Sequence, residues 1–413
     1  MRYFIFIIIT SLFFACKEKP SKKTEVSSEE SLELFKESFI PTFSNPANDS
    51  NSSLPRLFST GNQLYMSWVT QQDSLATLYY SAYENGEWLP KQKVTSGTDW
   101  FVNWADFPAI AVNNETVLSN ILQKSADGTY TYDIKLNLGI KVDTILKENF
   151  TLHSDGTKSE HGFVSIVPLN DGAFSVTWLD GRNTTGGHGE GKMTLRNATV
   201  NYNGLITERI ELDSSVCDCC NTAMAMTQKG PIVAYRDRSE EEIRDISIIR
   251  KSNSAWTSPY TIGKDNWKIA GCPVNGPAIA ALDATVVVAW FTSANGEGDV
   301  KVAFSKDNGA TFGTPFRVDG TNALGRVGVA LLDESRAVVT WMEPNGEDAV
   351  IKLMEINDHG YTQPSKLITK TKADRASGFP QLARIGDSLF VAWTSIRDDS
   401  KTVNIARLDS NNL

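Results

Sequence analysis

The sequence of 413 residues predicts an all-β fold, a β-propeller, and three observations lead to this prediction. Aromatic residues recur at the end of short apolar runs about every 54 residues, a period expected for propeller blades. Each of these runs is the second half of a pair divided by a turn, as in PAIAALDATVVVAW, which is typical of a β-hairpin. A third run rich in β-branched and aromatic residues follows each hairpin.

The repeats number seven, and two further marks keep them in register. The second strand of each repeat, except the one with Ile121, ends on an aromatic residue: Trp68, Trp178, Tyr235, Trp290, Trp341 and Trp393. The third strands are expected to start at Leu78, Tyr132, Met193, Ile246, Val300, Ile351 and Val403. A weaker fourth run follows most of them, so we expect seven four-stranded blades, with six blades as the alternative.

The last repeat reaches Leu413 before any fourth strand. The segment ESFIPTF (37–43) lies ahead of the first hairpin and is predicted to supply that strand. Such pairing closes the ring and leaves no open sheet edge. The propeller is therefore expected to span residues 37–413.

The N-terminal residues predict an export signal. Arg2 precedes an apolar run of about a dozen residues, shorter than the roughly 20 that a membrane-spanning helix needs. The residues Phe13 to Cys16 resemble the cleavage box of bacterial lipoproteins. The resemblance implies that residues 1–15 are removed, that Cys16 is lipidated, and that the protein is anchored at the bacterial cell envelope. An ordinary signal peptide is the alternative.

Residues 16–36 contain mostly Lys, Glu, Ser and Thr and are predicted to form a disordered tether. The net charge of −9 argues against a nucleic-acid partner, because nucleic acids favour basic surfaces. We expect a monomer that contacts the membrane through its lipid alone.

One face of the ring is predicted to hold the chemistry. If the four strands of a blade are called A to D, the A–B and C–D turns share one face and are short and plain. The B–C and D–A connections share the other face. They carry most of the polar residues that could bind a ligand or take part in catalysis. These are Trp104, Asp106, Glu160, His161, Asp180, Arg182, His188, Arg236, Arg238, Arg326, Glu343, Arg375 and four cysteines.

The arginines of this face predict an anion site, because the guanidinium fork matches carboxylate, sulfate and phosphate. The alternative is that they pair with the many acidic residues nearby. The acidic residues are candidates for glycoside hydrolysis, which needs a carboxylic acid and a second carboxylate or a tyrosine. Their alternative role is turn capping or arginine pairing.

The cysteines leave three possibilities open. Cys217, Cys219 and Cys220 precede the fourth blade and Cys272 precedes the fifth, so the four are expected to be neighbours. Disulfides are one possibility, with Cys272 joined to one of the other three. A copper or zinc site completed by His161 or His188 is the second. A reactive thiol is the third. Apart from a possible copper or zinc ion at these cysteines, we expect no cofactor.

One turn of the fifth repeat carries a recognisable motif, SKDNGATF, formed by Ser305, Asp307, Gly309, Thr311 and Phe312. It resembles the Asp box of sialidases and other BNR-repeat propellers. Its expected role is local: polar side chains bond backbone N–H groups, and glycine takes a positive φ.

The resemblance to sialidases implies a reaction on an anionic glycan, by glycoside hydrolysis of the exo-sialidase type. Asp106 or Asp180 would then be the acid, and Tyr235 with Glu343 the nucleophilic pair. The anion would be held by arginines, with Trp104 and His161 beside them: Arg182, Arg236, Arg238, Arg326 and Arg375. The alternatives are a propeller that binds a glycan or protein without catalysis, and a metal or redox site at the cysteines.

Overall fold

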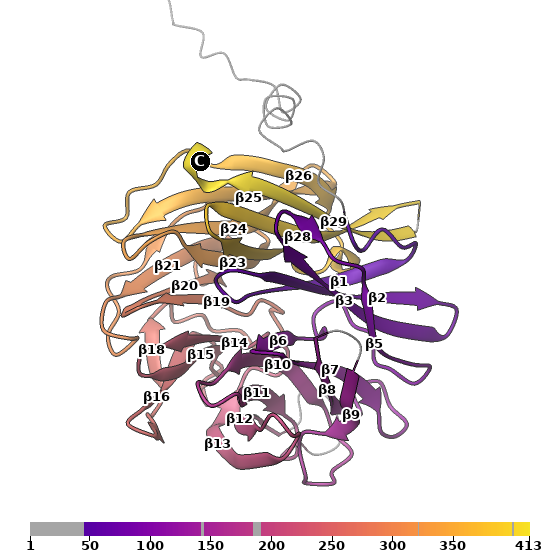
Figure 1. Ribbon diagram of the computed structural model, residues 1–413. Coiled ribbons are helices and arrows are strands. Elements are labelled where there is room, and N and C mark those ends of the chain that lie inside the picture. The colour runs from indigo at the N-terminus through magenta and orange to yellow at the C-terminus, as the bar shows by residue number, and fades with distance from the viewer. Residues whose placement is uncertain (1–44, 142–143, 185–190, 321, 399) are drawn as a thin grey trace, which may run out of the picture.

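A computed structural model describes residues 45–141, 144–184, 191–320, 322–398 and 400–413. Its strands form seven antiparallel sheets that follow one another around a ring (Figure 1). The predicted all-β propeller of seven blades is confirmed. The described residues contain two short 3-10 helices, η1 (Arg375–Ser377) and η2 (Ser410–Asn412). In the same residues, no helix is long and apolar enough to cross a membrane.

The blades follow the chain in order. Blade 1 contains β1 (Ser52–Ser59), β2 (Leu64–Gln72), β3 (Leu75–Glu84), β4 (Glu87–Trp88) and β5 (Gln92–Gly97). Blade 2 contains β6 (Ile110–Asn113), β7 (Thr116–Lys124), β8 (Tyr132–Ile140) and β9 (Thr144–Thr151). Blade 3 contains β10 (His161–Pro168), β11 (Phe174–Asp180), β12 (Met193–Val200) and β13 (Ile206–Val216). Blade 4 contains β14 (Ala223–Thr227), β15 (Gly230–Arg236), β16 (Ile246–Ser252), β17 (Ala255–Trp256) and β18 (Tyr260–Gly263).

The remaining blades repeat the pattern. Blade 5 contains β19 (Ala278–Leu282), β20 (Thr285–Thr292), β21 (Asp299–Ser305) and β22 (Phe316–Arg317). Blade 6 contains β23 (Gly325–Leu331), β24 (Arg336–Asn345), β25 (Asp348–Asn357) and β26 (Lys366–Lys372). Blade 7 contains β27 (Gln381–Ile385), β28 (Ser388–Arg397) and β29 (Ser400–Asp409). Every predicted third strand lies within an observed strand, namely β3, β8, β12, β16, β21, β25 and β29.

The aromatic residues that mark the repeats lie between neighbouring sheets. Trp68, Trp178, Trp290 and Trp341 are almost completely buried. Three of the indole N–H groups donate to a carboxylate: Trp178 to Asp180, Trp290 to Asp265 and Trp341 to Glu343, at 2.7 to 2.8 Å. A buried N–H without an acceptor would destabilise the fold, so these acids belong to the packing of the blades.

The ring closes where residues 45–53 meet β29. The Asn45 side chain donates to the Val403 carbonyl at 2.6 Å, and the Val403 N–H donates to Ser52 Oγ at 2.9 Å. Strand β1 lies beside β28 and β29 (Figure 1). The described part of the last sheet has three strands, and the predicted closing strand, 37–43, lies outside the described residues.

The SKDNGATF turn between β21 and β22 has the expected local bonds. Ser305 Oγ donates to Asp307 Oδ1 and accepts from the Gly309 N–H, while the Thr311 hydroxyl and N–H both donate to Asp307. Gly309 has φ +76°, and Phe312 packs against the core between blades 4 and 5. The motif therefore fixes a turn on the face opposite the polar connections.

Candidate functional site

The first strands of all seven blades surround a central channel of about 640 Å³. Its wall is formed by β1, β6, β10, β14, β19, β23 and β27 with the residues that immediately precede several of them. Phe107 and Phe379 precede the first strands of blades 2 and 7, so they lie at the mouth on the D–A side. This is the face that the sequence predicts to be functional.

A group of arginines and aromatic rings meets at this mouth, and we call it the mouth cluster. Its members are Arg56, Trp104, Phe107, Arg326, Arg375 and Phe379. The Trp104 and Phe379 rings stack with centroids 5.8 Å apart, and Phe107 lies 6.0 Å from Phe379. The guanidinium of Arg326 lies 5.1 Å from the Trp104 ring, and that of Arg375 lies 5.9 Å from it.

The three guanidinium groups of the mouth cluster differ in how firmly they are held. Arg326 is buried and donates to Ser377 Oγ and to the carbonyl oxygens of Gly378 and Asp374. Burial lowers the pKa of Arg326 to about 10, which leaves it charged at neutral pH. Arg56 lies 5.8 Å from the Phe107 ring, and burial likewise lowers its pKa to about 10.

Arg375 is exposed, and it forms no ion pair with any carboxylate in the described part of the chain. It follows directly after Asp374, whose side chain caps η1 by accepting from the Ser377 N–H. The exposed Arg375 is therefore the guanidinium of the cluster that is free to meet a ligand from solvent. Together with Arg56 and Arg326 it gives the mouth three positive charges in a chain of net charge −9.

The other predicted anion-binding arginines serve the fold. Arg236 is 2% exposed and donates to the carbonyl oxygens of Asn275, Arg244 and Phe291. Arg182 forms two bonds of 2.7 Å with Asp180, and Arg238 pairs with Glu242 and Asp218. Their donors are committed to these partners, which removes them from the anion site that the sequence predicts.

The predicted Tyr235–Glu343 pair is not formed. The Tyr235 hydroxyl donates to Asp213 at 2.5 Å within the core, and burial raises its pKa well above the ordinary value. Glu343 accepts from Trp341 and forms an ion pair with Lys352 at 2.6 Å. Each residue has its own partners, so the structure does not bring Tyr235 and Glu343 together as a nucleophilic pair.

Asp180, one of two predicted acids, is also held inside the fold. Burial favours its neutral form, but hydrogen bonds from Arg182 and Trp178 and the charge of His161 outweigh burial and lower its pKa. An ionised carboxylate with these donors cannot serve as a proton donor at neutral pH. Asp180 therefore orients Arg182 and accepts the hydrogen bond of the buried Trp178 indole.

Asp106, the other predicted acid, belongs to a buried group with Tyr132 and Glu160. The Tyr132 hydroxyl lies 3.0 Å from Asp106 Oδ2 and 2.8 Å from Glu160 Oε1, while Asp106 Oδ1 accepts from the Phe163 N–H at 2.7 Å. Burial, with the nearby charge of Glu160, raises the pKa of Asp106 to about 8. Asp106 is therefore protonated at neutral pH, and it directly precedes Phe107 of the channel wall.

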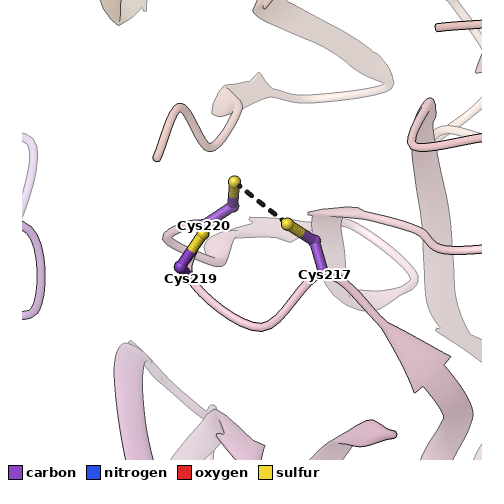
Figure 2. A group of neighbouring side chains, drawn as sticks. All are labelled: Cys217, Cys219 and Cys220. Atoms are coloured by element: carbon purple, nitrogen blue, oxygen red, sulfur yellow. Dashed lines mark hydrogen bonds between the residues drawn. The ribbon is translucent and has the colours of Figure 1, made fainter. Parts of the chain in front are cut away.

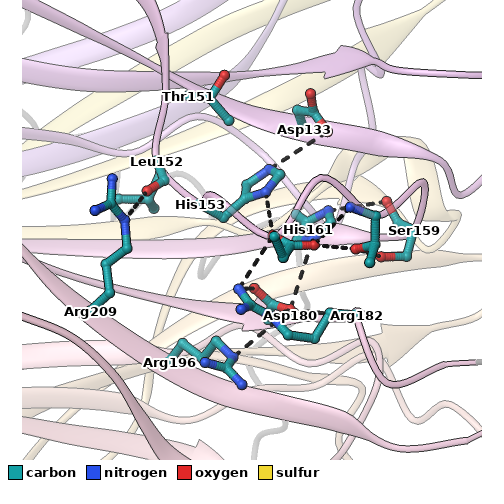
Figure 3. Close-up of polar contacts among 12 residues, drawn as sticks. Asp133, Thr151, Leu152, His153, Ser159, His161, Asp180, Arg182, Arg196 and Arg209 are labelled. Carbon is teal, nitrogen blue, oxygen red and sulfur yellow. Dashed lines mark hydrogen bonds and ion pairs between the residues drawn. The ribbon is translucent and has the colours of Figure 1, made fainter.

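His161 lies in a network of histidines and carboxylates (Figure 3). Its ring stacks on His153 with centroids 3.7 Å apart, and its Nε2 lies 3.3 Å from Asp155 and 3.8 Å from Asp180. Asp133 lies 3.6 Å from His153, so the donor set resembles a site for a divalent ion. Asp155 and Asp180 are both paired with Arg182, however, so part of their negative charge is already balanced without a metal ion.

The four predicted cysteine neighbours do meet, and in the structure all four are free thiols. Cys217 and Cys220 have sulfurs 3.4 Å apart, and Cys219 points into the same space (Figure 2). Burial opposes ionisation of Cys217, yet hydrogen bonds from Cys219 and Cys220 and the charge of Arg244 lower its pKa well below the usual value. His161 has its own partners in the other network, and His188 lies outside the described residues.

Three mouth residues, Arg56, Phe107 and Phe379, are absent from the predicted site. Phe107 and Phe379 stand before Pro108 and Pro380, at the start of the first strand, and this position was the available signal. In blade 1 the corresponding proline is Pro55, and Arg56 directly follows it. Tyr132 is likewise absent, although it opens a predicted third strand on the same face.

No family model matches the chain, and no curated protein matches its sequence. Solved structures resemble it in fold. A polysaccharide lyase of family PL25, an ulvan lyase bound to -[GlcA(1-4)Rha3S]-, aligns with a TM-score of 0.55 and 10% identity over 90% of this chain and 96% of that one. A phage phi92 endosialidase aligns with a TM-score of 0.49 and 10% identity over 89% of this chain and 68% of that one. At 10% identity the likeness to the ulvan lyase shows the propeller fold alone.

Stability is expected to fall as the pH rises from about 4 to about 8, because of Asp106. An unfolded aspartate ionises near pH 3.9, about 4 units below the folded value, so in this window only the folded state holds the proton. Asp106 contributes at most about 1.4 kcal/mol per pH unit to the decrease of the unfolding free energy with pH. Urea unfolding across this range should show a shallower slope for Asp106→Asn, whose amide mimics the protonated acid.

The matched control is Asp283→Asn, which removes one carboxyl group from an exposed turn with φ +53° that asparagine also adopts. This variant should keep the slope of the wild type. An unchanged slope in Asp106→Asn would contradict the assignment of the proton to Asp106.

Proposed function

We propose that this protein acts on an anionic glycan held at the mouth cluster. The observation that carries the proposal is the exposed guanidinium of Arg375 beside three aromatic rings at the open end of a channel, with the charges of Arg56 and Arg326 nearby. Guanidinium groups bind carboxylate and sulfate in a bidentate manner, and aromatic faces pack against the apolar faces of sugar rings. The ulvan lyase of similar fold, bound to a glycan that contains glucuronate and sulfated rhamnose, is consistent with this ligand class.

The Arg375→Gln variant is expected to bind sialyllactose about tenfold more weakly than the wild type, a loss of roughly 1.4 kcal/mol. The exposed Arg375 forms no ion pair within the described residues, and its contact with the Trp104 ring is distant at 5.9 Å, so the fold should be little affected. Calorimetric titration with sialyllactose and with neutral lactose measures the effect, and lactose affinity should not change.

The control is Lys229→Gln, which removes one positive charge from an A–B turn on the opposite face. It should bind sialyllactose as the wild type does. If the wild type binds sialyllactose and a glucuronate oligosaccharide no better than lactose, the anion site is refuted.

Hydrolysis of the exo-sialidase type is the reaction that we propose for this site, and a specific observation favours it. A general acid must be protonated at the working pH, and the raised pKa of Asp106 provides this. Tyr132 and Glu160 stand beside it as a tyrosine and a carboxylate at hydrogen-bonding distance. Asp106 is 2% exposed, so the proposal includes a movement of residues 103–107 that admits the ligand.

Release of free sialic acid from sialyllactose tests the reaction. The wild type should release it, whereas Asp106→Asn should be at least about a hundredfold slower, because one general acid contributes 10²–10⁴-fold. Binding should persist in this variant, since Asp106 is outside the mouth cluster. Turnover by Asp106→Asn at the wild-type rate would refute Asp106 as the acid, and binding without turnover by the wild type would leave a glycan-binding propeller.

We also propose that the propeller is held as a single copy at the bacterial cell envelope by a lipid on Cys16. The proposal rests on the sequence, because residues 1–44 lie outside the described residues. Detergent partitioning should place the wild type in the detergent phase and Cys16→Ser in the aqueous phase. Equal partitioning of the two proteins would exclude the lipid anchor.

A further inference from the structure

The four domain cysteines converge from two connections that are distant in sequence. Cys217, Cys219 and Cys220 lie between β13 and β14, and they are 1%, 7% and 2% exposed. Their sulfurs all lie within 4.8 Å of one another. Cys272 lies between β18 and β19 at the surface, and its sulfur is in hydrogen-bonding contact with that of Cys219. The result is a pocket of three buried sulfurs with a fourth at its opening.

The spacing of these sulfurs suits a metal ion. Zinc–thiolate bonds of about 2.3 Å place the sulfurs of a tetrahedral site roughly 3.8 Å apart. The sulfurs of Cys217 and Cys220 are 3.4 Å apart, and all three buried sulfurs lie within 4.8 Å of one another. We propose that Cys217, Cys219 and Cys220, with Cys272 as a fourth ligand, bind one thiophilic metal ion, zinc(II) or copper(I).

The surroundings provide the charge balance that such a site requires. Four thiolates around a divalent ion carry two negative charges, which need cations nearby when they are buried. The Arg244 guanidinium lies 3.3 Å from Cys217 Sγ, and the buried Arg236 donates to the Arg244 carbonyl at 2.6 Å. The Asn275 N–H points at Cys220 Sγ at 3.4 Å. N–H groups and cations directed at sulfur are the usual outer contacts of metal thiolates.

The cysteine pocket is physically joined to the mouth cluster through Asn275. Its N–H contacts Cys220, its carbonyl accepts from Arg236, and its side-chain oxygen accepts from the Arg326 N–H at 2.8 Å. Arg326 in turn lies over Trp104. A metal ion at the cysteines would therefore fix the connection that positions Arg326, although the metal site itself stands without the proposed glycan function.

Metal uptake by the reduced, metal-free full-length protein tests the proposal. Zinc(II), cobalt(II) and copper(I) are supplied separately under anaerobic conditions, and native mass spectrometry counts the ions bound. We expect one ion per chain, and cobalt(II) should give the visible ligand-field bands of a tetrahedral thiolate site. The wild type needs no substitution in this experiment, so failure to take up any of the three ions overturns the proposal.

Variants then assign the ligands. Cys219→Ser and Cys220→Ser should lose stoichiometric binding, and Arg244→Gln should weaken it about 10- to 100-fold, as the loss of an outer contact does. Cys272→Ser distinguishes the ions, because a copper(I) site is satisfied by three thiolates and should keep its affinity, whereas zinc should bind more weakly when water replaces the fourth thiolate. Lys229→Gln is the control that should bind like the wild type. Wild-type affinity in Cys219→Ser and Cys220→Ser would overturn the assignment.

Discussion

The packing of a large aromatic side chain between neighbouring sheets is the interaction on which the rest of the structure depends. Trp68, Trp178, Trp290 and Trp341 fill this position in four blades and are at most 1% exposed. Each of these side chains helps to set the angle between two neighbouring sheets. The seven angles between sheets together determine whether the ring closes. In three of these blades the buried indole N–H donates to a carboxylate, whereas the N–H of Trp68 has no hydrogen-bond partner among the described residues. Carboxylates are thereby drawn to the D–A face for reasons of packing alone.

This dependence explains which parts of the site could be predicted. The period, the third strands and the polar face follow from patterns that repeat along the chain, and the structure confirms the seven blades. Asp180 and Glu343 each stand two residues after a blade tryptophan, and the sequence does not show whether such a carboxylate meets an indole or a substrate. The sequence also does not show toward which neighbouring blade a side chain points. Trp104, Arg326 and Arg375 could therefore be assigned to this face, but their proximity to Arg56 could not be predicted. Arg236 is buried, which keeps it from binding a ligand, and no spacing in the sequence predicts this burial.

The two polar regions of the face follow different electrostatic rules. At the mouth cluster, guanidinium groups lie over aromatic rings and close to one another, which leaves positive potential that an anion can satisfy. In the other polar region, groups of opposite charge lie close together: His161 is 3.8 Å from Asp180, and Arg244 is 3.3 Å from Cys217 Sγ. Asn275 contacts both the mouth cluster and the cysteine pocket, so a change in either region alters the hydrogen bonds available to the other. The strong overall negative charge of the chain therefore says little about the potential at the channel.

The seam between residues 45–53 and β29 has a consequence for how the site comes into existence. The bonded residues at the seam are 351 and 358 positions apart in sequence, and Arg56 meets Gln381 across a separation of 325. Contacts this distant form late in folding, after the cost of closing a long loop has been met. Arg56 and Phe379 of the mouth cluster lie on opposite sides of the seam. A partly synthesised or truncated chain can therefore form individual blades but cannot assemble the mouth cluster. The capacity to bind is in this way a property of the finished ring, and any ligand that spans the seam will itself help to hold the ring shut.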